Sequence, residues 1–146
     1  MVADLQPNAK TSSTALKPLF RAKLTVLHCY NVLNEIIVPG NANYEILDVK
    51  LPCSSMTREI TFLKAFEGGA DAVIVLVCPE GTCRYFQGNL RTAKRVARVK
   101  KMLDDIGLDG RRLNLYNIPH GDQARAHEII QKTLSGLIEL GPSPAK

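Results

Sequence analysis

Four cysteines are the residues of this chain whose type and position could carry chemistry: Cys29, Cys53, Cys78 and Cys83. Each of the first three comes just after a short apolar segment with strand character, and Cys83 follows Cys78 through a Pro-Glu-Gly-Thr loop. The chain has no signal-peptide pattern at its N-terminus, so we expect a cytoplasmic protein, in which cysteines stay reduced. Cysteines there indicate metal ligands or redox groups before disulfides.

Positions at strand ends predict that these thiols meet. Carboxyl ends of parallel strands lie at one edge of a sheet, where such folds place their sites. The Pro79–Thr82 loop is short enough to return Cys83 to the same point. The strand candidates that the first three cysteines follow are Leu24–Leu27, Tyr44–Val49 and Ala72–Val77.

Strands and helices alternate around these positions. The Ala72–Val77 run is continuously apolar, as in a central parallel strand that is buried on both faces. Helical spacing of apolar residues follows between the strands and after the last of them. We predict an α/β fold: a four-stranded, mostly parallel sheet in the order 2-1-3-4 with helices on both faces, a flavodoxin- or Rossmann-like three-layer sandwich. The remaining predicted elements are helices at Thr57–Phe66 and Asn89–Ile106, a strand at Arg112–Tyr116, and a helix capped by Asp122 that runs to Leu140.

A single domain over residues 21–141 accounts for this pattern. Residues 1–20 are polar and predict a flexible or partner-bound N-terminal tail, and residues 142–146 predict an unstructured C-terminal tail. No apolar run approaches the roughly 20 residues that span a bilayer, so no direct membrane insertion is expected.

Basic residues gather on the Asn89–Ile106 helix, and the chain carries a net charge of +5. Such a face favours an anionic partner. Aromatic stacking motifs do not accompany the charge, so we expect an acidic protein surface and no nucleic acid. The candidate docking residues are Arg91, Lys94, Arg95, Arg98 and Lys101.

Four converging thiolates bind either a structural zinc or an iron–sulfur cluster. Zinc ribbons use CxxC pairs, which this chain lacks, whereas single cysteines on separate loops suit a 2Fe–2S cluster. Buried structural cysteines and a Cys78–Cys83 disulfide remain alternatives. His28 is a possible alternative ligand or neighbour of the ligands, and Tyr85 could shield the cluster or contact a partner. No acid–base pair or nucleotide-binding loop indicates an independent catalytic site.

The central segment resembles the delta subunit family of methyl-viologen-reducing hydrogenase. The likeness runs through Lys64–Asp71, the apolar strand and the Cys78 to Asn89 motif, with Gly81, Cys83, Tyr85 and Gly88. Leu51-Pro-Cys-Ser and Cys29-Tyr-Asn-Val look like further cysteine segments of that family. The resemblance implies one 2Fe–2S cluster on Cys29, Cys53, Cys78 and Cys83. It also implies that the protein relays electrons between an oxidoreductase and a heterodisulfide reductase-like flavoprotein.

Two positions depart from the family pattern. Val32 stands where the family has the second cysteine of its first CxxC motif, and Ser55 replaces a glycine. Four cysteines are enough for one cluster if the missing cysteine is not a ligand. Otherwise the chain is an assembly or adaptor subunit of the same kind of complex, without a cluster.

Overall fold

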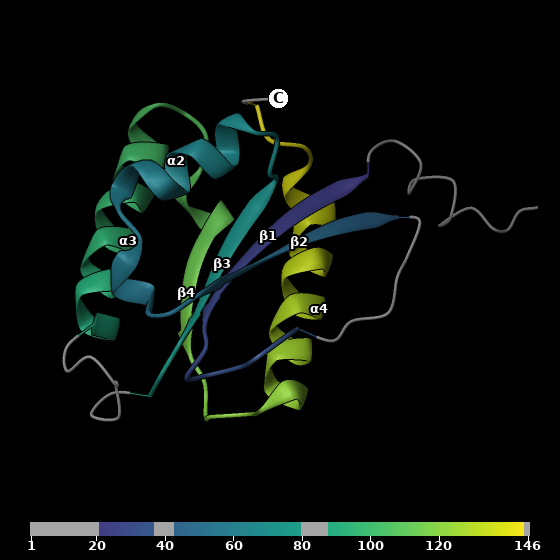
Figure 1. The fold of residues 1–146 in the computed structure, drawn as a ribbon. Coiled ribbons are helices and arrows are strands. Elements are labelled where there is room, and N and C mark those ends of the chain that lie inside the picture. Colours follow the sequence, from purple (N-terminus) through teal and green to yellow (C-terminus); the bar gives the residue numbers. More distant parts are fainter. Residues whose placement is uncertain (1–20, 37–42, 80–87, 145–146) are drawn as a thin grey trace, which may run out of the picture.

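A four-stranded parallel sheet in the order β2-β1-β3-β4 forms the centre of the computed structural model, which describes residues 21–36, 43–79 and 88–144 (Figure 1). The predicted fold and strand order are therefore confirmed. The elements are β1 (Ala22–Cys29), β2 (Tyr44–Leu51), the 3₁₀ helix η3 (Ser54–Met56), α2 (Glu59–Glu67), β3 (Ala72–Val77), α3 (Gly88–Asp105), the 3₁₀ helix η4 (Gly110–Arg112), β4 (Leu113–Asn117) and α4 (Gln123–Leu140).

Helices cover both faces of the sheet, with α2 and α3 on one face and α4 on the other (Figure 1). β3 shows why helices must cover both faces of the sheet, because all six of its residues are buried. Alternate side chains of β3 enter opposite cores: Ile74 and Leu76 pack with residues of α4, and Val73 and Val75 pack with Phe62, Phe66 and residues of α3. Burial of these large apolar side chains stabilises the sandwich by roughly 2 kcal/mol each.

β1 is longer than its apolar run predicts. It extends from Ala22 to Cys29, in parallel register with β2 from the pair Ala22 and Tyr44 to the pair Cys29 and Leu51. Pairing with β2 along its whole length brings Lys23 and His28 into the strand, which no apolar pattern signals. Cys29 is therefore the last residue of the strand and does not follow it.

The Asp122 and Gly141 signals in the sequence predict both ends of α4 correctly. The Asp122 carboxylate accepts a hydrogen bond from the Arg125 backbone N–H at 2.9 Å, as expected of an N-cap. Gly141 ends the helix with φ 76°, a conformation that favours glycine. No helix within the described ranges is both long and apolar enough to cross a membrane.

The segment after α4 corrects one expectation. Residues 142 and 143 are not an unstructured tail, because Ser143 is buried and its N–H donates to the Asp71 carboxylate at 2.8 Å. The buried Arg112 guanidinium donates to the backbone carbonyls of Leu140, Gly141 and Pro142. Two buried charged groups far away in sequence thus hold a segment whose own composition indicates disorder. The expected N-terminal tail, residues 1–20, lies outside the described residues.

Candidate metal centre

Cys29 and Cys78 form a buried pair of thiols whose Sγ atoms lie 3.6 Å apart. Cys29 ends β1 and Cys78 directly follows β3, and these strands are neighbours in register up to His28 and Leu76. The parallel pairing therefore brings both thiols to the same edge of the sheet, as the sequence predicts for strand ends. Both are free cysteines in this structure.

This separation suits two ligands of one metal ion. Two thiolates about 2.3 Å from a tetrahedral metal lie about 3.8 Å from each other. Burial and the neighbouring Cys78 raise the pKa of the Cys29 thiol to about 12, so Cys29 is a neutral thiol near pH 7 without a metal. A bound metal would supply the positive charge that ionises it. The thiol pair thus fits a thiolate-bound metal group.

Three asparagines fix the turn that carries Cys78. The Asn31 amide donates to Cys78 Sγ at 3.7 Å, a long contact. The Asn89 and Asn117 amides donate to the Cys78 carbonyl oxygen at 2.9 and 2.8 Å, and Asn89 also donates to the Pro79 carbonyl at 3.1 Å. Sequence reasoning assigned no role to these side chains, although Asn89 belongs to the motif that carries the family resemblance.

Cys53 lies beyond the end of β2, at the same edge of the sheet. The hydrogen bond from Tyr30 N–H to the Leu51 carbonyl, 2.9 Å, keeps the chain after β1 beside the end of β2. Cys53 is buried, and its Sγ accepts hydrogen bonds from the Ser55 hydroxyl at 3.1 Å and the Ser55 N–H at 3.4 Å. Arg95 of α3 holds the following turn, since its guanidinium donates to the Ser55 and Thr57 carbonyls, both at 2.6 Å.

A third ligand does not join the thiol pair within residues 21–36, 43–79 and 88–144. In those ranges no three histidine, cysteine or acidic side chains lie close enough together to hold a metal ion. Cys83 and Tyr85 fall in the range 80–87, outside the described residues. The described part of the site therefore consists of the Cys29–Cys78 pair, with Cys53 on the neighbouring strand end.

His28 is completely buried, and both of its ring nitrogens have hydrogen-bond partners. Nδ1 lies 3.1 Å from the Leu33 carbonyl oxygen, and Nε2 contacts the Asp48 carboxylate. A carbonyl only accepts, so Nδ1 carries a proton. Metal ligation by His28 would require one of these two hydrogen bonds to break.

Val32 occupies a tight turn directly beside the thiol pair. It is buried in the apolar cluster that contains Cys29 and Cys78. Its N–H donates to the Cys29 carbonyl at 3.0 Å, and its carbonyl accepts from Gly121 N–H at 2.7 Å. The structure therefore has a buried valine in the turn that directly follows Cys29.

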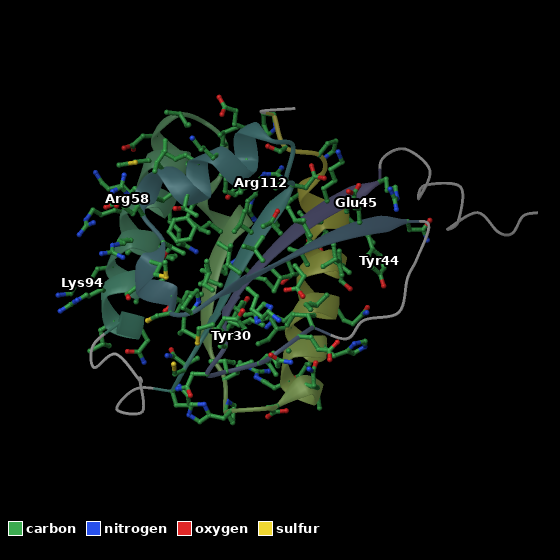
Figure 2. All side chains as sticks on the ribbon, viewed as in Figure 1. Tyr30, Tyr44, Glu45, Arg58, Lys94 and Arg112 are labelled. Atoms are coloured by element: carbon green, nitrogen blue, oxygen red, sulfur yellow. The ribbon has the colours of Figure 1, made fainter. Side chains whose placement is uncertain are left out.

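The basic face of α3 is divided between internal contacts and exposed charge. Arg95 binds the turn after Cys53, and Arg98 pairs with Glu59 of α2. The side chains of Arg91, Lys94 and Lys101 are exposed. Figure 2 shows Lys94 pointing outward from α3, with Arg58 also directed outward near the start of α2.

The sequence matches a known protein family over most of its length. The sequence pattern of the methyl-viologen-reducing hydrogenase delta subunit matches residues 33–141. The chain belongs to this family. The matched range includes Cys53, Cys78 and Cys83, and it begins just after Cys29 and Val32.

Relatives of this delta subunit family member have two kinds of name. The vhu iron-sulfur subunit of the F420-non-reducing hydrogenase of Methanocaldococcus jannaschii is 34% identical over 98 residues, which are 67% of this chain and 73% of that protein. The corresponding protein of Methanococcus maripaludis is 32% identical over the same shares. One polypeptide of the Ferredoxin/F(420)H(2)-dependent CoB-CoM heterodisulfide reductase of Methanosarcina acetivorans is 33% identical over 94 residues, which are 64% of this chain but 12% of that protein.

Proposed function

We propose that this chain is an electron-transfer subunit that carries one 2Fe–2S cluster on Cys29, Cys53, Cys78 and Cys83. The observation that carries the proposal is the buried Cys29–Cys78 pair, whose 3.6 Å separation suits two ligands of one iron. Relatives named as iron-sulfur subunits of hydrogenases support an iron–sulfur group of some kind. Each iron of a 2Fe–2S cluster needs two thiolates, so Cys53 and Cys83 would serve the second iron.

The cluster would supply the one-electron acceptor, and the chain would set its properties. Burial of Cys29, Cys53 and Cys78 keeps water from their sulfur atoms. The asparagine contacts around Cys78 and the Ser55 contacts to Cys53 fix the directions of both side chains. Rigid ligands lower the reorganisation that accompanies a change of charge, which favours electron transfer over substrate chemistry.

The proposed partners are an oxidoreductase that donates or accepts electrons and a heterodisulfide reductase-like flavoprotein subunit. In the Methanosarcina acetivorans relative, a segment similar to this chain is part of a longer polypeptide of a heterodisulfide reductase. A fused segment and a separate protein need the same neighbour, so the fusion supports docking of this chain to such a polypeptide. The exposed side chains of Arg91, Lys94 and Lys101 would meet an acidic surface there.

A non-redox adaptor is the second candidate function. Val32 stands where the resemblance to the family implies a cysteine, and it is buried in the same apolar cluster as Cys29 and Cys78. If that cysteine is a ligand in the family, the present chain keeps the fold and docking face without a complete ligand set.

Anaerobic purification followed by iron and acid-labile sulfide analysis separates the two functions. About two irons per chain and an EPR signal after reduction are expected for the relay. Iron-free wild-type protein prepared without oxygen would contradict the cluster and favour the adaptor. Cys78→Ser should lose the signal, whereas the matched control Ser54→Ala, which removes a nearby hydroxyl without touching a thiol, should keep it.

A further inference from the structure

Ser55 offers two hydrogen-bond donors to one sulfur atom at the candidate metal centre. Its hydroxyl lies 3.1 Å from Cys53 Sγ and its backbone N–H lies 3.4 Å from the same atom. The hydroxyl contact is well within the range of hydrogen bonds to sulfur, and the Cys53 side chain is buried. Water therefore does not compete freely with the two Ser55 donors for this sulfur.

Contacts from α3 keep Ser55 in this position. Arg95 donates to the Ser55 carbonyl and to the Thr57 carbonyl two residues later, which fixes the η3 turn on both sides of Met56. The Thr92 hydroxyl donates to Ser54 Oγ at 3.1 Å. Ser54 and Ser55 thus have different roles, since Ser54 bonds to the helix and Ser55 bonds to the sulfur.

We infer that Ser55 raises the reduction potential of the cluster by donating hydrogen bonds to the Cys53 thiolate, with Arg95 as the residue that positions it. This rests on the proposed 2Fe–2S function. Reduction adds one negative charge to the cluster, and part of that charge lies on the ligand sulfurs. A donor aimed at such a sulfur stabilises the reduced form more than the oxidised form.

Potentiometric titration monitored by EPR, on full-length protein purified without oxygen, tests the inference. Ser55→Ala removes the hydroxyl and should shift the midpoint potential to a more negative value at unchanged iron content. Ser55→Thr keeps a hydroxyl and should stay near the wild-type potential. Ser54→Ala is the matched control, because it removes a neighbouring hydroxyl that does not contact sulfur, and it should leave the potential unchanged.

The outcomes separate this inference from the proposed function. Wild-type iron content with an unchanged potential in Ser55→Ala would overturn the tuning role and leave the cluster intact as a conclusion. Wild-type protein without iron would overturn both. If Ser55→Ala does not load iron, Ser55→Gly provides the same measurement. Loss of iron in both variants, while Ser54→Ala loads normally, would overturn tuning and make Ser55 a residue of cluster assembly.

Discussion

The Sγ atoms of Cys29 and Cys78 lie 3.6 Å apart, although 49 positions separate the two residues in the sequence. A disulfide needs about 2.05 Å, so a small side-chain movement would join them. In metal-free protein treated with diamide, we expect a Cys29–Cys78 crosslink that peptide mass spectrometry identifies. Cys53→Ala should retain it. A crosslink mainly to Cys83 would contradict the prediction that Cys29 and Cys78 are nearest neighbours. Loss of the Cys29–Cys78 crosslink after cluster loading would support the role of both thiols as cluster ligands.

The Val32→Cys variant tests whether the four cysteines of the chain are enough to bind one cluster. We expect Val32→Cys to leave the iron content per chain unchanged, because Cys29, Cys53, Cys78 and Cys83 already provide four thiolates. Its stability should fall by about 1 kcal/mol, since the smaller side chain leaves space in the apolar cluster. Iron analysis and urea unfolding measure the two effects. A clear gain of iron in Val32→Cys would show that valine has replaced a ligand.

Substitution of the buried Arg112, which donates hydrogen bonds to several backbone carbonyls, should cause a large loss of stability. Arg112→Met leaves the backbone carbonyls of Leu108, Asp71 and Gly141 without their charged donor. We expect unfolding to become easier by about 3 kcal/mol in urea titrations. Arg111→Met is the control, because that side chain is exposed and bonds locally to Asp109, and it should cost much less than Arg112→Met. Equal losses of stability in the two variants would contradict this role of Arg112.

Asp109 predicts a pH-dependent contribution to stability. The Arg111 guanidinium bonded to it lowers the pKa of the Asp109 carboxyl to about 2, from an ordinary value of 3.8. A pKa below that of the unfolded chain means that Asp109 stabilises the fold above about pH 4 and that this is lost towards pH 2. Asp109→Asn should therefore reduce stability near pH 7, by about 0.5 kcal/mol for so exposed a pair, and the difference should vanish near pH 2. Thermal unfolding of both proteins across that range checks the sign.

Exposed charge on α3 predicts salt-dependent docking. Lys94→Glu should weaken binding to a heterodisulfide reductase-like flavoprotein by about tenfold at low salt, and less at high salt, because surface attraction is screened. Isothermal titration calorimetry at two salt concentrations measures this. Lys132→Glu makes the same charge change on α4, across the sheet, and should bind as wild type. A larger effect from Lys132 would move the proposed interface to the α4 face.

Local patterns predict the elements and both ends of α4. The continuous apolar run of β3, the Asp122 cap and the Gly141 stop each act within a few residues, so their signals lie in neighbouring letters of the sequence. The extension of β1 to Cys29 and the anchoring of Ser143 depend on partners far away in the chain. Composition around Gly141 indicated disorder, and Asp71 and Arg112 overrode it because buried charges need partners.

The sequence by itself determined the fold class, the strand order and the family, because apolar periodicity and the Cys78 to Asn89 motif are local properties of the chain. It also indicated that the first three cysteines share one edge of the sheet. Only the tertiary structure decided that Cys29 and Cys78 are the pair in contact, that Ser55 bonds to Cys53, and that Arg95 supports this turn. Side-chain contacts of this kind depend on packing between strands and helices distant in sequence, which no local pattern records.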